Sequence, residues 1–387
     1  MKKASRISEI AFFVGYALII FSDMYNYIPW LQSILTIVDV VAVLALTVSF
    51  LVGAFSGKIK MSWFAIVGMS IFTALVAVTA ISSDIRTLLK LPFLFLAFMN
   101  VKFDKVIGFD LKCRLLLTLV IMALSTVGLN GNTVLEYRNG LMRNSFGAGH
   151  PNAIAFEWSV ICADLFYLVG YKKTKKVNAR MAVLFAIGVF IFNFFLIGSR
   201  TNLIFMVLLT AVFVFKDRFR IKSCVGKAII RNMFIVCLLV SFLGVVVYRL
   251  GLPISYTLDK ILSRRLEYES FAIREYGITF FGNNIKGVLV DNAYLGMLLR
   301  YGILLTACMG FMYYATIKKL TESSKYKLLL LIFIVFMFYG LSETPIYSPG
   351  KNPFVLLLIY SFIPMKGLLS ECMGAPKKMK AKSEAIK

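Results

Sequence analysis

The stretch "VVAVLALTVSFLVGAFSGKIKMSWFAIVGMSIFTALVAV", residues 40–78, decides the fold. Two apolar runs, residues 40–57 and 61–83, carry no charged side chain and are separated by a connection containing Lys58 and Lys60. A run of about 18 apolar residues is long enough to cross a bilayer as a helix, and a helix satisfies its own backbone hydrogen bonds in lipid. The stretch therefore predicts two membrane-spanning helices joined by a tight basic turn.

Similar apolar runs recur along the whole chain of 387 residues, which is 59% hydrophobic with a mean hydropathy of +0.82. We predict an all-α polytopic integral membrane protein in which residues 1–387 form a single transmembrane domain. About twelve spans are expected. Their centres lie near residues 15, 42, 71, 93, 121, 161, 189, 208, 240, 304, 336 and 359.

The charge distribution predicts the orientation in the membrane. The chain has 43 Lys and Arg against 19 Asp and Glu, a net charge of +24. Most basic residues fall on one side, in segments such as "YKKTKKVNAR", "FKDRFRIKSCVGK" and "PKKMKAK". Cytoplasmic loops carry this excess, so we expect both termini in the cytoplasm and the protein in the plasma membrane. Basic residues on that side are attracted to the anionic lipid of the inner leaflet, so the net charge does not require a nucleic-acid partner, and none is expected.

The longest predicted outer segment is residues 252–290, which we expect to contain an amphipathic helix at the outer membrane face. Arg265 and Glu269 stand four residues apart and are predicted to pair on that helix. Its apolar residues recur at helical spacing: Leu258, Ile261, Leu262 and Leu266.

Several predicted spans begin at the outer face with residues that start helices. Pro151 suits the first helical position, Ser199 is a candidate N-cap, and either Asp291 or Asn292 is a candidate cap for a third span. Helix N-termini carry partial positive charge and free N–H groups, and they therefore bind phosphates. Each residue alone is an ordinary helix-start residue, so the functional argument depends on their occurring together.

Arginines accompany these helix starts. Arg143 and Arg200 lie beside two of them, and Arg264 with Arg265 lie in the long outer segment. Convergence of these side chains predicts a cationic pocket at the outer boundary, although any one of them could instead anchor the protein at the membrane interface. The chain has one histidine, no C-x-x-C pair and no acidic cluster. No metal site, cofactor or disulfide framework is therefore expected.

The single histidine begins a polar pattern. His150 lies between glycines and a proline, and Glu157 and Asp164 follow it at intervals of seven residues. This spacing places the three on one helix face and predicts a polar stripe that descends from the outer surface. The stripe could be a groove for a sugar chain or a proton path. It could also be structural, with a carboxylate paired to a basic residue such as Arg300.

Four motifs, in the order "FGAGHPNAIA", "GSRTNLIF", "ILSRRLEY" and "VDNAYLGMLLRYGIL", carry a family likeness across roughly residues 140–305. Together they resemble the Wzy-type polymerases of capsular polysaccharide and exopolysaccharide, and they are distantly similar to the O-antigen ligases. In their GHPN and DN-x-YL forms they look like the polymerases of Gram-positive bacteria. Ligases carry a His-Asn pair where this chain has Asp291-Asn292, which argues against ligase chemistry.

The resemblance implies a fold like that of the GT-C glycosyltransferases and metal-independent chemistry at the outer membrane face. A growing glycan would move from undecaprenyl pyrophosphate onto a lipid-linked repeat unit, with a chain-length regulator and a flippase as partner proteins. The family arginine corresponds to Arg265, with Arg264 as a second contact.

The residues and the resemblance together define a set of candidate site residues. His150, Glu157 and Asp291 are candidates for catalysis, and Tyr256 and Tyr268 are further candidates for packing against sugar. A membrane transporter or flippase for lipid-linked oligosaccharide is the main alternative, and a structural membrane component is another. The predicted pyrophosphate ligands are Arg143, Arg200, Arg264 and Arg265, and the predicted glycan ligands are Asn152, Asn292 and Tyr294.

Overall fold

The computed structural model describes residues 2–26, 28, 31–57, 59, 61–130, 134–136, 142–171, 178–219, 223–285 and 288–365. The basic C-terminal tail, Cys372, and Lys58 and Lys60 lie outside these residues. The described chain is mainly helical, as predicted, with one two-stranded antiparallel hairpin of β1 (Val134–Glu136) and β2 (Met142–Asn144). The helices are α1 (Lys2–Tyr25), α2 (Gln32–Phe55), α3 (Trp63–Ser83), η2 (Arg86–Leu89), α4 (Lys90–Phe98), α5 (Phe103–Thr126), α6 (Pro151–Tyr171), α7 (Ala179–Phe192), η3 (Asn193–Ile197), α8 (Arg200–Phe215), α9 (Cys224–Arg231), α10 (Met233–Arg249), α11 (Pro253–Ile261), α12 (Arg265–Tyr276), α13 (Ala293–Thr321), η4 (Ser324–Tyr326), α14 (Lys327–Tyr339), η5 (Pro345–Tyr347) and η6 (Pro353–Ser361).

Six helices in the described residues are long and apolar enough to cross a membrane, which is consistent with an all-α membrane protein. They are α1, α2, α3, α6, α13 and the continuous pair α7 and η3; α9 and α10 would form a seventh span bent by 68°. The other predicted span centres fall on α4, α5, α8, α14 and η6. Of these, α4 and η6 are only nine residues long. Helix length and composition therefore support six or seven of the twelve predicted spans.

Close packing of small residues joins the first two helices. Gly15 on α1 faces α2 so closely that a Cβ atom there would lie 2.8 Å from Cγ of Leu46. Ser8 Oγ donates to the carbonyl of Ser49 at 2.9 Å, and Ser49 Oγ donates back to the carbonyl of Ser8 at 2.8 Å. Small residues and reciprocal hydrogen bonds are the means by which helices associate in lipid, where burial of apolar surface gives no driving force.

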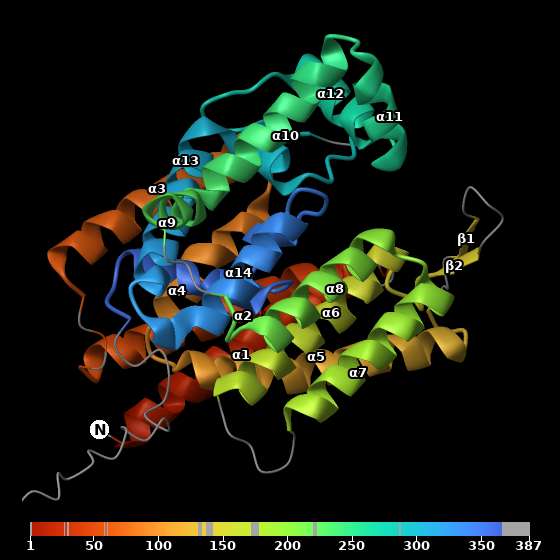
Figure 1. Cartoon of the computed structure of the whole chain (residues 1–387). Helices are drawn as coiled ribbons and strands as arrows, with labels where there is room; N and C mark the ends of the chain where they lie inside the picture. Colours follow the sequence, from red (N-terminus) through yellow and green to blue (C-terminus); the bar gives the residue numbers. More distant parts are fainter. Residues whose placement is uncertain are drawn as a thin grey trace, which may run out of the picture.

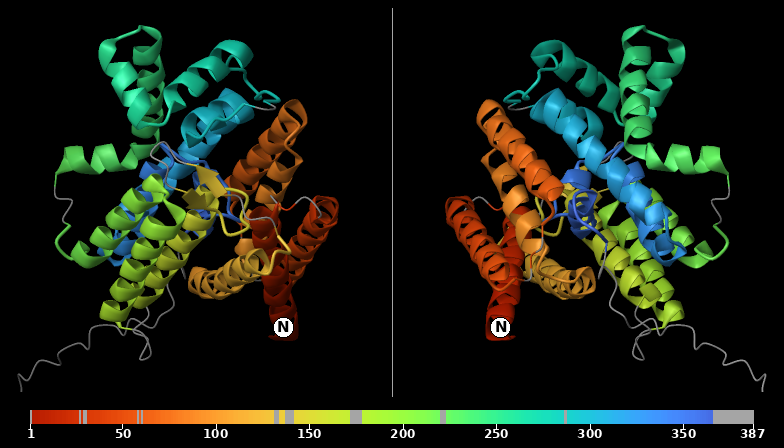
Figure 2. Two further views of the ribbon diagram at one scale, coloured as in Figure 1. Left: turned by 90° about the vertical axis from the view of Figure 1, so that its right-hand side faces the viewer. Right: turned by 90° about the vertical axis from the view of Figure 1, so that its left-hand side faces the viewer.

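The C-terminal elements lie in the middle of the molecule, between the N-terminal helices and the bundle of α6, α7 and α8 (Figure 2). Every residue of η6 is buried, and α14 buries eleven of its thirteen residues. Their apolar side chains therefore contact protein. Figure 1 shows α14 beside α8, and α11 with α12 at the upper end of α10.

The predicted amphipathic helix of the outer segment is two helices, α11 and α12. Ser263 and Arg264 adopt positive φ angles of 60° and 64° and break the chain between them. The left-handed conformation cannot continue a right-handed helix, so Leu266 does not share the exposed face of Leu258 and Ile261. Leu266 is buried, whereas Ile261 is 67% exposed. The amphipathic helix is therefore confined to α11, where Leu258 and Ile261 are exposed and Ser255 and Asp259 are buried, and only its predicted extension to Leu266 was wrong. The predicted pairing of Arg265 with Glu269 was also wrong, because Arg265 pairs with Asp291 and Glu343.

Candidate functional site

Six of the predicted site residues line one cavity of about 500 Å³, which we call the arginine cavity. It lies where α6, α8 and α12 begin and where α14 ends. Phe205, Phe338 and Tyr339 form part of its apolar wall. The predicted residues in its lining are Arg143, His150, Asn152, Arg200, Arg265 and Asp291.

Local backbone geometry places two of the arginines at this cavity. The β-hairpin pairs Leu135 with Arg143, and the Arg143 side chain then crosses Gly198. A Cβ atom on Gly198 would lie 3.2 Å from Cγ of Arg143, and Gly198 has a φ of 69° that favours glycine. This left-handed residue ends η3, and α8 begins two residues later at Arg200. Arg200 thus lies at the helix N-terminus, as predicted.

Asn152 links two of the arginines through hydrogen bonds. Its Oδ1 accepts from Nη2 of Arg143 at 2.8 Å and from Oγ of Ser199 at 2.9 Å. Its Nδ2 donates to Oε1 of Glu343 at 2.8 Å, and the same oxygen accepts from Nη2 of Arg265 at 2.8 Å. The two guanidinium groups are therefore held in a fixed relation by an amide and a carboxylate that are themselves bonded.

Arg265 is held in the cavity wall by two carboxylates, which compensate its charge. Its Nε lies 3.2 Å from Asp291, and its Nη2 bonds Glu343; the Arg265 and Glu343 side chains are 16% and 15% exposed. Burial opposes the charge, but Glu343 and Asp291 outweigh it and raise the pKa of Arg265. Arg264 lies elsewhere: its side chain is 62% exposed and pairs with Glu267 at 3.8 Å. The prediction of Arg264 as a second ligand in this cavity is therefore corrected.

His150 presents a proton to the cavity. The backbone N–H of Asn152 donates to Nδ1 of His150 at 3.1 Å, so Nδ1 uses its lone pair as an acceptor. Burial, with Arg143 next, lowers the pKa of His150 below 6.5, which makes the imidazole neutral at pH 7. A neutral imidazole that accepts at Nδ1 carries its proton on Nε2. His150, a candidate for catalysis, is thus arranged as a hydrogen-bond donor.

Glu157 is not in the arginine cavity. Glu157 is buried and forms an ion pair with Nη1 of Arg114. Arg114 also forms a forked pair with Asp110, in which Nε donates to Oδ2 at 2.8 Å and Nη2 donates to Oδ1 at 3.1 Å. Asp164 is fully buried beside the same group. Glu157 therefore belongs to a buried ionic cluster, as the structural interpretation of the stripe expects, and a groove or proton path along α6 stays a prediction. The partner is Arg114 on α5, not Arg300.

Asn292 and Tyr294 have structural contacts. Asn292 caps α13, because its Oδ1 accepts from the backbone N–H groups of Tyr294 and Leu295 at 3.0 and 3.1 Å. Its Nδ2 donates to Ser241 Oγ and to the carbonyl of Leu341. The Tyr294 side chain is fully buried, and its hydroxyl donates to the carbonyl of Met337 at 2.7 Å. Neither side chain is placed to bind glycan, which corrects that expectation.

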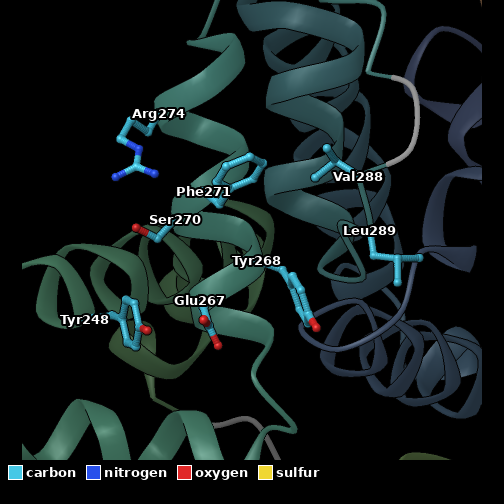
Figure 3. A pocket seen from close by; sticks show the side chains of 8 residues that line it. All are labelled: Tyr248, Glu267, Tyr268, Ser270, Phe271, Arg274, Val288 and Leu289. Carbon is cyan, nitrogen blue, oxygen red and sulfur yellow. The ribbon is translucent and has the colours of Figure 1, made fainter.

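The two tyrosines of the outer segment also lie outside the arginine cavity. Tyr268 lines a separate cavity of about 590 Å³ beside α12, together with Tyr248, Phe271 and Arg274 (Figure 3). Tyr256 packs against Tyr248 with ring centroids 5.8 Å apart and is 57% exposed. Contact of either tyrosine with a sugar stays a prediction.

The sequence interpretation did not include the residues at the end of α14, which form part of the wall of the arginine cavity. Ser342 and Tyr339 line it, and Glu343 bonds two of its residues. The carbonyl of Ser342 accepts from Nη1 of Arg265, and the Tyr339 hydroxyl donates to Asn202 Oδ1 at 3.2 Å. A signal was present, because these residues follow a predicted span that ends at the outer face.

Comparisons with protein-family models, with curated proteins and with solved structures found no match to this chain. The likeness to Wzy-type polymerases therefore depends on the four sequence motifs. The arginine cavity is an independent observation, because its geometry comes from contacts between residues far apart in the chain.

Proposed function

We propose that this protein is a polysaccharide polymerase at the outer face of a bacterial plasma membrane. It transfers a growing glycan from undecaprenyl pyrophosphate onto a lipid-linked repeat unit. The observation that carries the proposal is the convergence of Arg143, Arg200 and Arg265 on one cavity beside the starts of α6 and α8. Guanidinium groups and helix N-termini are the groups that bind a diphosphate in the absence of a metal.

The reaction needs charge stabilisation where a bond breaks. The glycosyl C1–O bond to the diphosphate breaks with its electron pair leaving on the phosphate oxygen, and an acceptor hydroxyl oxygen bonds to C1. Arg200 and Arg143 face the developing negative charge, which fixed positive groups stabilise most effectively in a site that excludes water. Asp291 is the more exposed of the two carboxylates that contact Arg265. When a phosphate oxygen takes the place of Asp291, the Nε–H of Arg265 donates a hydrogen bond to that oxygen.

The hydroxyl proton of the acceptor must also leave. Asp291 lines the cavity and is the carboxylate best placed to receive this proton, whereas Glu157 is committed to Arg114. The Nε2–H of His150 is then a donor to a phosphate oxygen or to the acceptor. Displacement of Asp291 from Arg265 by the substrate would free that carboxylate as a base in the same step.

The proposal includes the finer architecture. The chain would have about twelve spans, with α4, α14 and η6 as short or re-entrant segments, and a fold of the GT-C kind. Both termini would be cytoplasmic, and residues 252–290 would lie outside. A flippase would supply the repeat unit, and a chain-length regulator would act on the product.

The test compares cavity arginines with an arginine outside the cavity. Arg265→Ala and Arg200→Ala should each abolish long polymer and leave single lipid-linked repeat units in the membrane. Arg264→Ala is the matched control, because Arg264 is adjacent in sequence, exposed and outside the cavity. Lys replacements at 200 and 265 should restore little activity, because lysine cannot form the guanidinium fork.

The same glycan analysis separates the alternatives. Polymer of normal length in both alanine variants would contradict the proposal. Repeat units retained in the cytoplasmic leaflet of a deletion strain would indicate a flippase. Normal polymer that fails only to reach a final acceptor would indicate a ligase.

A further inference from the structure

A second polar cavity, of about 300 Å³, lies across one loop from the arginine cavity. The loop follows α14: Ser342 lines the arginine cavity, whereas Thr344, Tyr347 and Ser348 line the second cavity. The ends of α1 and α3 complete its wall with Asp23 and Ile85. By the alternation of predicted spans, those two helices end on the side of the membrane where α6 and α8 begin. We call this second space the Arg300 cavity.

The Arg300 cavity has an excess of positive charge. Lys90, Arg300 and Lys351 line it, and Asp23 is the one carboxylate in its lining. Lys90 is already neutralised, with its Nζ 2.5 Å from Asp39 and 3.8 Å from Asp23. Arg300 forms no ion pair among the described residues, so its charge is available to the cavity. The Nε of Arg300 is buried and has no hydrogen-bond partner among the described residues.

A glycine-dependent break in α13 positions Arg300. Gly302 has a φ of 76° and a ψ of 176°, a conformation essentially restricted to glycine. The chain of residues 279–283 inserts at this break. The N–H of Ile303 donates to the carbonyl of Thr279 at 2.9 Å, and the N–H of Asn283 donates to the carbonyl of Leu299 at 2.9 Å. Backbone groups released by the break are thus satisfied, and Arg300 is held at the end of a short helix.

We propose that the Arg300 cavity binds the diphosphate headgroup of the second, acceptor, lipid-linked saccharide. This inference depends on the proposed polymerase function. The acceptor reacts at its non-reducing end, whereas its own diphosphate is at the reducing end, one repeat unit away. The two diphosphates therefore need separate anion sites on the same side of the membrane. The arginine cavity and the Arg300 cavity, separated by the loop of residues 342–351, satisfy that requirement.

The chemistry of the lining suits a lipid diphosphate. Arg300 offers a planar fork to phosphate oxygens, and Lys351 adds a second cation. Hydroxyl groups of Thr344 and Tyr347 also line the cavity and can donate to phosphate oxygens, whereas the Ser348 hydroxyl donates to Oδ2 of Asp23 at 2.9 Å. The two cavities on either side of this loop then hold the donor lipid and the acceptor lipid in a fixed relation, which lowers the entropic cost of bringing the two substrates together.

The test is a count of binding sites with undecaprenyl diphosphate, using native mass spectrometry and calorimetry on the full chain in lipid nanodiscs. The wild-type protein should bind two molecules. The double variant Arg300→Gln with Lys351→Gln should weaken one site by about tenfold or more, the loss expected when charge-assisted hydrogen bonds to phosphate are removed. Arg200→Gln should weaken the other site. Arg274→Gln, in the separate cavity beside α12, is the control and should leave both sites unchanged.

These measurements separate the two proposals. One site in the wild type, or two unchanged sites in the Arg300 and Lys351 double variant, would overturn the inference while leaving the polymerase proposal intact. An unchanged affinity of the remaining site in the double variant shows that the protein is folded. Polymer that persists in Arg200→Ala cells would overturn the polymerase function even if two sites are found. Loss of a site in Arg274→Gln would place the second headgroup beside α12 and refute its assignment to the Arg300 cavity.

Discussion

Glu269 should make the stability of the fold depend on pH. It lies on α12, one turn after Arg265, and is only 3% exposed. Burial raises the pKa of its carboxyl from 4.5 to about 8, although the backbone N–H of Asn292 and the charge of Arg265 lower it in part. Glu269 is therefore mostly protonated in the folded protein at pH 7, whereas it is ionised when the chain is unfolded.

The direction of the effect follows from proton binding. Below pH 4.5 both states hold the proton, and the protonated carboxyl gives its full stabilising contribution. Between pH 4.5 and about 8 only the folded state holds it, so the free energy of unfolding falls as the pH rises. One pKa unit corresponds to about 1.4 kcal/mol, and the shift from 4.5 to about 8 corresponds to a loss of about 5 kcal/mol. Above pH 8 both states are ionised and the contribution is constant.

Glu269→Gln removes this titration and keeps a side-chain oxygen for the N–H of Asn292. We expect the variant to gain several kcal/mol relative to the wild type between pH 5 and pH 8.5, measured by chemical unfolding in detergent micelles. Glu267→Gln is the control, because Glu267 is on the same helix but its side chain is 47% exposed. Parallel curves for the wild type and Glu269→Gln across this range would refute the reasoning, since other titrating groups contribute equally to both.

Three other results are expected. Gly302→Ala should destabilise the protein by about 3 kcal/mol or more in thermal unfolding, because a Cβ there overlaps the amide N of Gly282 and the carbonyl O of Phe280. Gly108→Ala on α5, where the added Cβ meets nothing within 4 Å, should be neutral or stabilising, and equal effects at both glycines would contradict the packing argument. His150→Gln should reduce polymer synthesis by about tenfold, the value of one hydrogen bond, whereas Asp291→Asn should abolish it; the reverse order would make His150 the base. Polymerisation by purified protein should be unchanged by EDTA, because arginines stabilise the negative charge on the leaving diphosphate. A loss of activity in EDTA that Mg²⁺ restores would argue against this.

The starts of the functional helices could be predicted from sequence because helix capping is local chemistry. Pro151 begins α6, Arg200 begins α8, and Asn292 caps α13. The gathering of Arg143, Arg200 and Arg265 at one cavity followed from the alternation of spans across the membrane, which needs no knowledge of tertiary contacts. These residues were predictable because their positions depend on neighbours in sequence and on the side of the membrane.

Hydropathy could not separate spanning helices from short buried ones. The residues of α14 and η6 are as apolar as those of a membrane span, yet they are covered by protein. A hydropathy scale gives an apolar residue the same value whether lipid or protein surrounds it. Glu343 could have been considered from its place after a predicted outward-running span. Its bonds to Asn152 and Arg265 join residues 191 and 78 positions away, and such contacts are not encoded in any local pattern.

The buried ions on α5 and α6 give the loop between the two cavities its position. Arg114 is fully buried, and isolated charges at such depth are unfavourable unless they are paired. Asp110 and Glu157 pair with it, and Nη2 of Arg114 also donates to the carbonyl of Gly350 at 3.0 Å. That carbonyl belongs to the loop that carries Glu343 towards the arginine cavity. Glu157, which was a candidate for a substrate groove, therefore lies behind the site, where with Asp110 it orients the guanidinium that holds the loop.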